Sequence, residues 1–264
     1  WNEEFRATLW GHMTLYNLKQ LVEPIFTGFK DTTNPWDVPT NADVADAAHL
    51  QGGHVTFTHP ASNAADPFTG AYSAKSLPVD VALGKIDSID INFTFEATVP
   101  LWHRLLNCGF RIPASAGTDC FLNRIQSQLP GWARAYVKVA GPFSYGGWVK
   151  GLHAGRSFVT SGPILELSAA EKGLGETITL EAAGSVPVKA AAVYRAPLSR
   201  VEILVNGDVV AAGTLSPDRA QGAIDQPVRL ERSGWLGLRA LAEDGTQAHS
   251  SPIYVEVAGR PASS

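Results

Sequence analysis

The stretch VEILVNGDVVAA, residues 201–212, decides the fold of the second half of the chain. Two short apolar runs, 201–206 and 209–212, lie on either side of Asn206-Gly207-Asp208. Asn-Gly readily adopts the positive φ angles of a type I′ turn. The stretch therefore predicts a β-hairpin with a tight turn at its centre.

Further strand patterns extend outward from this hairpin to both ends of the second half. Short alternating or apolar runs separated by turn residues occur at 164–168, 177–181, 228–231, 234–242 and 253–257. About seven short strands over ~95 residues are typical of an immunoglobulin-like β-sandwich. We therefore predict such a domain over residues 163–264; an all-β extension of the preceding domain is the alternative.

The first half, residues 1–162, mixes strand and helix patterns. A strand-like run at 54–59 ends at Pro60, a second lies at 86–93, and a helical pattern at 99–108 is followed by Gly109. This order of strand, helix and strand, with polar residues at strand ends, is typical of an α/β barrel. In such barrels the chemistry lies at the carboxyl ends of the strands.

Composition and charge exclude several functional classes. The chain has 264 residues, a formal net charge of −4 and a pI near 6.0, which argues against a nucleic-acid surface. No apolar run approaches the ~18 residues of a membrane span. The chain begins at Trp1 and its single Met is Met13. We interpret it as lacking an N-terminal segment; the compartment and oligomeric state stay open, an exported bacterial protein being one interpretation.

Possible metal ligands occur at or near the ends of strand-like segments. They are the pair Glu3-Glu4, then Gly11-His12, Thr58-His59-Pro60 and Gly117-Thr118-Asp119. Imidazole together with carboxylate suits zinc, manganese or iron. Taken singly, each has a plain structural explanation: a turn or core histidine, a helix cap for Asp119, or a solvated glutamate.

Taken together, these motifs resemble the PHP (polymerase and histidinol phosphatase) superfamily, and more narrowly its CehA/McbA-type metallohydrolases. The order is Glu-x7-His, then His-Pro after a strand, then Gly-Thr-Asp. The resemblance covers most of the chain. It is carried by residues 3–6, 10–12, 105–111, 116–119, 154–163 and 250–255.

The resemblance implies a PHP-like distorted (β/α) barrel at 1–162, N-terminally incomplete, with metal ligands at Glu4, His12, His59 and Asp119. His59 and Asp119 would also be catalytic, and the intact protein would hold more than one divalent ion (zinc, manganese or iron). The chain departs from the family in two ways. The opening His-x-His strand is not in this sequence, and Cys120-Phe121 follows Asp119 where many members place a further histidine.

Three functional hypotheses follow. The first is a metal-dependent hydrolase that uses metal-activated water on an ester, carbamate or phosphoester bond of a small-molecule substrate. The second is a PHP-type phosphoesterase acting on a phosphorylated sugar or nucleotide. The third is a non-catalytic glycan- or protein-binding protein with a decayed PHP domain. The sequence has no Gly-x-Ser-x-Gly elbow, phosphate-binding glycine loop or dinucleotide fingerprint.

Other polar residues receive weaker assignments. Asp90 and Asn92 lie on one face near a strand end and are candidates for substrate or supporting contacts. His54, five residues before His59, is interpreted as structural. His49 and His153 carry no spacing signal.

Overall fold

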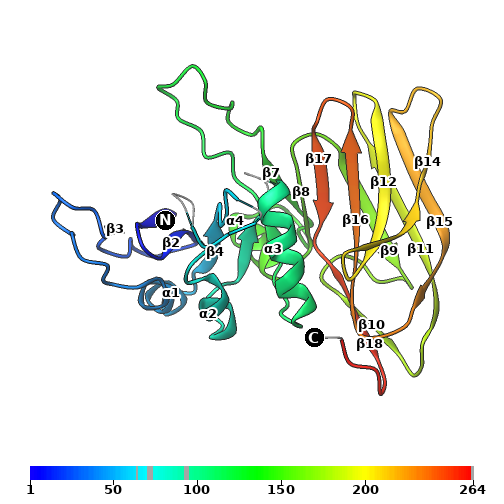
Figure 1. Cartoon of the computed structure of the whole chain (residues 1–264), viewed down its shortest axis with the longest axis horizontal. Coiled ribbons are helices and arrows are strands. Elements are labelled where there is room, and N and C mark those ends of the chain that lie inside the picture. The colour runs from blue at the N-terminus through cyan, green and yellow to red at the C-terminus, as the bar shows by residue number, and fades with distance from the viewer. Residues whose placement is uncertain (64, 70–73, 92–94, 263–264) are drawn as a thin grey trace.

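The computed structural model describes residues 1–63, 65–69, 74–91 and 95–262. Figure 1 shows a mixed part that contains the N-terminus on one side and a layered β structure on the other, with helix α3 between them. Of the helices in these described ranges, none is long and apolar enough to cross a membrane.

A six-stranded sheet forms the centre of the mixed part, in the order β3-β1-β2-β4-β5-β6. Its strands are β1 (Glu3–Ala7), β2 (Gly11–Tyr16), β3 (Phe26–Thr27), β4 (His54–Thr58), β5 (Ser88–Asp90) and β6 (Ala114–Ser115). The pairs β1–β2 and β2–β4 are antiparallel, whereas β4, β5 and β6 run parallel. The carboxyl ends of these three parallel strands therefore meet at one edge of the sheet.

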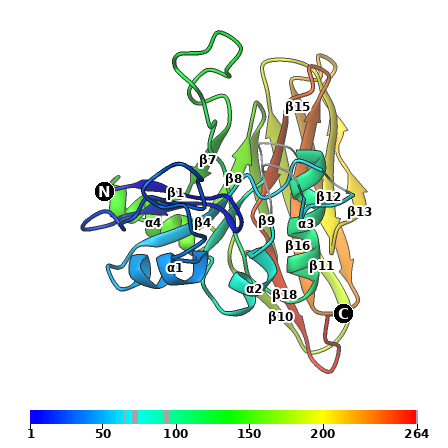
Figure 2. The same cartoon turned by 60° about the vertical axis from the view of Figure 1, so that its left-hand side comes forward.

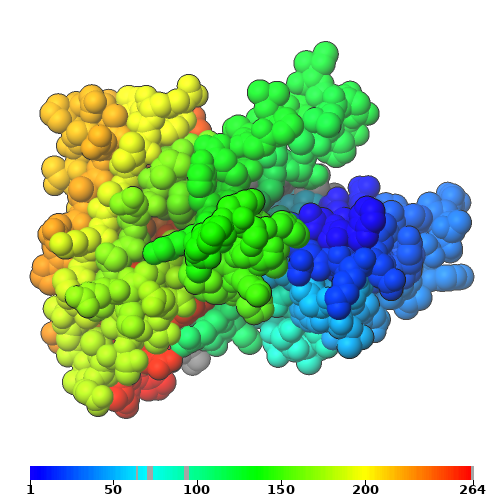
Figure 3. All heavy atoms as spheres, turned by 180° about the vertical axis from the view of Figure 1, so that it is seen from behind, coloured from blue at the N-terminus to red at the C-terminus, as the bar shows by residue number. Residues whose placement is uncertain are grey.

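Among the described residues, four helices accompany this sheet: α1 (Asn41–His49), α2 (Leu77–Ala82), α3 (Phe95–Asn107) and α4 (Tyr145–His153). Thr40 and Asp43 cap α1 reciprocally, which satisfies two backbone donors at its start. Trp102 of α3 is fully buried and joins the core that also holds Phe5 and Phe57. On the face seen in Figure 3, the α4 region lies beside the N-terminal strands, where the ring of Trp148 packs 5.9 Å from that of Tyr16.

Two further sheets form the β-sandwich (Figure 2). One has eight strands, ordered β10-β18-β16-β17-β8-β7, with β12 and β13 attached at β16; the other has four, ordered β14-β15-β11-β9. Side chains from both sheets fill one core, including Val188, Ile203 and Leu238. The strands are β7 (Arg134–Val137), β8 (Ser157–Thr160), β9 (Ile164–Ala169), β10 (Thr177–Leu180), β11 (Gly184–Val193), β12 (Leu198–Val205), β13 (Asp208–Ala212), β14 (Thr214–Leu215), β15 (Gln221–Leu230), β16 (Gly234–Ala242), β17 (Gln247–Ser250) and β18 (Ile253–Val257).

The hairpin predicted from residues 201–212 is confirmed. Strands β12 and β13 pair antiparallel, with Val205 opposite Asp208. Asn206 and Gly207 between them have φ angles of 54° and 97°, the positive values that a type I′ turn requires.

The predicted fold class, a PHP-like distorted (β/α) barrel, N-terminally incomplete, followed by an immunoglobulin-like β-sandwich, is wrong because the described residues form no such barrel. A (β/α) barrel needs parallel strands joined by helices, but β1, β2 and β4 run antiparallel. Over the described ranges the parallel pairs of the first sheet are β1–β3, β4–β5 and β5–β6, which are too few to close a barrel. The eight-stranded sheet also includes β7 and β8, which precede residue 162.

Candidate metal centre

Polar side chains gather where the parallel strands of the first sheet end. His59 follows β4 directly, Asp90 is the last residue of β5, and Asp119 lies four residues after β6. The antiparallel hairpin β1–β2 adds Glu4 and His12 next to them, since His12 pairs with Thr58 across the sheet. Ligands and active sites of open α/β sheets commonly lie at this carboxyl edge.

Three of the predicted ligands converge closely. The Oε1 atom of Glu4 lies 3.2 Å from Nδ1 of His12 and 3.5 Å from Nε2 of His59. One candidate ligand atom from each residue lies within 4.8 Å of the others. Ligands of a tetrahedral zinc ion at about 2.0–2.1 Å lie ~3.3 Å apart, so small side-chain rotations would bring all three onto one ion.

The two neighbouring glutamates of β1 have separate roles because successive side chains point to opposite faces of a strand. Glu3 is buried, and its Oε2 accepts a hydrogen bond from the backbone N–H of Val22 at 2.8 Å. Burial raises the pKa of Glu3. Glu4 points to the histidines instead, which makes it the candidate ligand of the pair.

A small cavity of about 140 Å³ lies beside this cluster. Asp119 lies on its wall, as do Glu4 and His59, but the carboxylate of Asp119 does not belong to the group of three within 4.8 Å. The structure thus brings Glu4, His12 and His59 together and places Asp119 on the wall of the same cavity, outside that group. The other wall residues are Thr14, Tyr16, Thr58, Asp90 and Gly117.

The ionisable side chains around the cavity differ in their pKa values. Burial would raise the pKa of Glu4, but its contacts with His12 and His59 outweigh that effect and lower it well below the usual range. Burial raises the pKa of Asp90 to about 7, helped by the negative charges of Glu4 and Asp119. Burial and the charge of Asp90 also raise the pKa of Tyr16, so its phenol stays protonated at neutral pH.

Two of the predicted site residues have strained backbones. His59 has a φ angle of 33° and Asp119 one of 47°. Positive φ angles are uncommon for residues other than glycine and cost of order 1 kcal/mol or more. Such outliers cluster at functional sites, where the surrounding structure holds them.

The sequence interpretation underestimated two cavity residues. Asp90, expected only as a substrate or supporting contact, is 5% exposed, and its Oδ1 has no hydrogen-bond partner in the described part of the chain. Tyr16 was not considered, although His12, Thr14 and Tyr16 alternate on β2 and share one face. That spacing from His12 is the signal that could have identified it. Asn92 lies outside the described residues.

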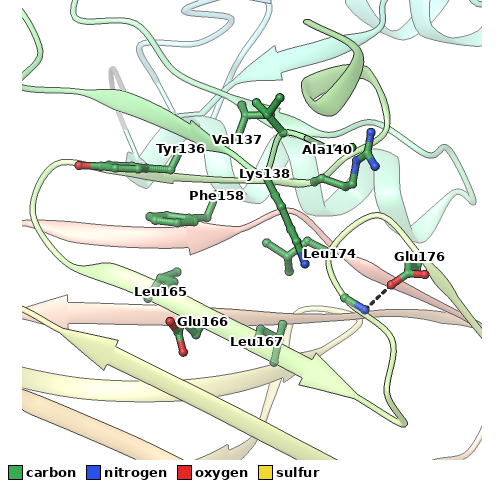
Figure 4. A pocket seen from close by; sticks show the side chains of 13 residues that line it. Tyr136, Val137, Lys138, Ala140, Phe158, Leu165, Glu166, Leu167, Leu174 and Glu176 are labelled. Carbon is green, nitrogen blue, oxygen red and sulfur yellow. Dashed lines mark hydrogen bonds between the residues drawn. The ribbon is translucent and has the colours of Figure 1, made fainter. Parts of the chain in front are cut away.

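A larger cavity, about 700 Å³, lies elsewhere, against strands β7, β8 and β9. Figure 4 shows aliphatic and aromatic side chains around it, among them Leu165, Leu167 and Leu174. The stacked rings of Tyr136 and Phe158 lie 5.0 Å apart at its wall, and Lys138 and Glu176 supply charge. None of the candidate ligands lines this cavity.

Comparisons with known proteins show no family for the chain. No protein-family model and no curated protein matches it. A solved structure described as Clostridium thermocellum CbhA fibronectin(III)-like modules aligns with a TM-score of 0.26 and 16% identity, over 37% of this chain and 98% of that one.

Proposed function

We propose that this protein is a metal-dependent hydrolase that cleaves an ester, carbamate or phosphoester bond of a small molecule. The observation that carries the proposal is the convergence of Glu4, His12 and His59 within 4.8 Å at the carboxyl edge of the sheet, beside the carboxylates of Asp90 and Asp119.

The residues present fit a divalent ion. Two imidazoles and carboxylates form the mixed nitrogen and oxygen set that suits zinc, manganese or iron. The buried Oδ1 of Asp90, without a hydrogen-bond partner among the described residues, is an acceptor that a nearby cation would stabilise. Glu4, His12 and His59 would hold the ion, with Asp119 as the candidate fourth ligand.

When bound, a divalent ion lowers the pKa of a water molecule and polarises the bond to be cleaved. Asp90, with a pKa of about 7 in the metal-free protein, can hold or release a proton near neutral pH. The protonated phenol of Tyr16, on the same wall, can donate a hydrogen bond to a developing negative charge. Glu4 keeps 37% of its side chain exposed, so the cluster is open to a substrate from solvent.

The resemblance of the motifs to CehA/McbA-type metallohydrolases of the PHP superfamily supports the same assignment and is itself part of the proposal. It rests on short motifs and not on a shared barrel. Among the hypotheses, the phosphoesterase and the decayed binding protein remain outcomes of the test.

The test is hydrolysis of a panel of aryl esters, aryl carbamates and p-nitrophenyl phosphate before and after chelation. We expect chelation to abolish turnover and zinc, manganese or iron to restore it. His59→Ala and Asp119→Ala should each lower kcat by at least ~10², the loss expected when the group that positions the ion is removed. Asp225→Ala, which removes an exposed carboxylate of the sandwich, is the matched control.

The outcomes separate the hypotheses. Turnover confined to p-nitrophenyl phosphate would favour the phosphoesterase. Metal binding without turnover on any substrate would favour the binding protein. Activity that survives both exhaustive chelation and the two substitutions would overturn the proposal.

A further inference from the structure

A second group of imidazoles and carboxylate lies at the opposite end of β4 from His59. His54 begins β4, Asp87 precedes β5, and His153 is the last residue of α4. One candidate ligand atom from each of these three residues lies within 4.8 Å of the others. His49, the last residue of α1, contacts the same aspartate.

One ring nitrogen of His54 faces this group without a hydrogen-bond partner among the described residues. Its side chain is 2% exposed, and Nε2 lies 2.8 Å from Oγ of Ser88. Its Nδ1 lies 4.0 Å from Oδ2 of Asp87 and has no hydrogen-bond partner in the part of the chain that the structure describes. With Nε2 donating to Ser88, Nδ1 presents a lone pair to the group. Metal-binding histidines are commonly oriented by such a hydrogen bond from their second nitrogen.

Asp87 is held in place as an ionised carboxylate. Its Oδ2 accepts hydrogen bonds from the backbone N–H of Val55 at 2.7 Å and from Nε2 of His49 at 2.9 Å. Burial would raise the pKa of Asp87, but the hydrogen bonds from His49 and from the backbone of Val55 outweigh it and lower the pKa. Its Oδ1 faces Nδ1 of His153 at 3.6 Å.

The ion pair between His49 and Asp87 accounts for one oxygen of the carboxylate but not for Nδ1 of His54. At 4.0 Å from Oδ2 of Asp87, this nitrogen is too far away for a hydrogen bond. A buried, neutral nitrogen without a partner costs roughly 1–3 kcal/mol. A cation between His54, Asp87 and His153 would satisfy that nitrogen and bind Oδ1 of Asp87 at the same time.

We propose that His54, Asp87 and His153 form a second site for a divalent transition-metal ion such as Zn²⁺, with His49 orienting the carboxylate. Two imidazoles and one carboxylate form a donor set that zinc takes in proteins, with a further position left for water. The side chain of His153 is 65% exposed and can rotate, which supplies the small contraction that binding needs. A bound ion would link the end of α4 to the start of β4. This proposal does not depend on the proposed hydrolase function.

The test is Zn²⁺ titration of the metal-free protein against a chromophoric chelator. His12→Ala removes a ligand of the first cluster and should leave one equivalent of bound Zn²⁺. Adding His153→Ala should weaken that remaining equivalent by at least ~10-fold, the usual effect of losing a ligand or its support. Lys150→Ala in the same helix, also added to the His12→Ala variant, is the matched control and should leave the affinity for the remaining equivalent unchanged.

A thermal readout separates binding at this site from activity. Zn²⁺ should raise the Tm of the His12→Ala variant and leave that of the double variant unchanged. The proposal is overturned if the His12→Ala variant binds none of Zn²⁺, Co²⁺, Ni²⁺ or Cu²⁺ below ~100 μM, or if His153→Ala changes its affinity by less than about twofold. Because His153 and Lys150 lie outside the first cluster, failure of the hydrolase assay would leave these results unaffected.

Discussion

Three histidines, His54, His103 and His249, are buried in their neutral form. Burial lowers the pKa of His54 and of His103 to about 4 and that of His249 to about 3. In the unfolded chain each regains a pKa of about 6.5. Between pH 6.5 and about 4 the unfolded state therefore binds more protons at these three positions, and their contribution to the free energy of unfolding falls as the pH falls.

We expect each of these histidines to change the free energy of unfolding by up to about 1.4 kcal/mol per pH unit between pH 6.5 and about 4. Urea denaturation of the metal-free protein at pH 7, 6 and 5 measures the slope. His103→Phe keeps a ring beside Trp102 and Trp235 and removes the buried Nε2, which lacks a hydrogen-bond partner among the described residues. This variant should lose the contribution of one histidine, up to about 1.4 kcal/mol per pH unit. A slope equal to that of the unsubstituted protein would contradict the assignment.

Two residues show how far the candidate site could be predicted from the sequence. The choice of Glu4 over Glu3 came from the family resemblance, and strand alternation indicated only that one of the two could be a ligand. The structure does point the two carboxylates to different partners. His54, in contrast, was interpreted as structural because it lies five residues before His59 on one strand and so points to the opposite face. Its partners Asp87 and His153 are distant in sequence. No spacing along one chain reveals a group that four separate elements bring together.

At the scale of elements, the turn of the β12–β13 hairpin can be tested alone. Gly207 has a φ angle of 97°, which other residues rarely adopt. Gly207→Ala should lower the free energy of unfolding by about 1–2 kcal/mol. Gly146→Ala is the matched control, because Gly146 lies in α4 with open space around its Cα. Alanine there should be neutral or stabilise by up to about 1 kcal/mol. Equal unfolding midpoints in urea for the two variants would contradict this argument.

Strand prediction succeeded where alternation and turn residues coincide. Strands β16 and β18 were predicted with the ends that the structure gives, Gly234–Ala242 and Ile253–Val257. Strand β11, Gly184–Val193, was missed because it contains Pro187 and a run of alanines, which weaken the strand signal. The barrel prediction failed for another reason: strand patterns do not encode which neighbour a strand pairs with, and β2 pairs antiparallel with both β1 and β4.

At the scale of the whole molecule, the first 162 residues and the rest of the chain share a β-sheet and a hydrophobic core. Strand β17 pairs with β8, and Leu204, Trp235 and Tyr254 belong to the same core as Phe5. The indole of Trp235 donates a hydrogen bond to Oδ1 of Asn107 in α3 at 2.7 Å. The predicted division at residue 162 therefore cuts through a sheet and a core.

A fragment of residues 1–162 should consequently fail to fold as a stable unit. It lacks the strand that covers one edge of β8 and three large side chains of its core. Circular dichroism and urea denaturation should show no cooperative transition, whereas the full chain should unfold in a single one. A fragment that unfolds cooperatively with a sharp midpoint would show that the shared sheet is dispensable.

The pairing of β8 with β17 has a consequence during synthesis of the chain. Thr160 pairs with Ala248, a residue that leaves the ribosome much later. At roughly 5–20 residues per second the delay is on the order of ten seconds. During that time β8 has an uncovered edge, to which strands of other nascent chains can add. The rate of translation between residues 160 and 248 therefore influences the yield of folded protein.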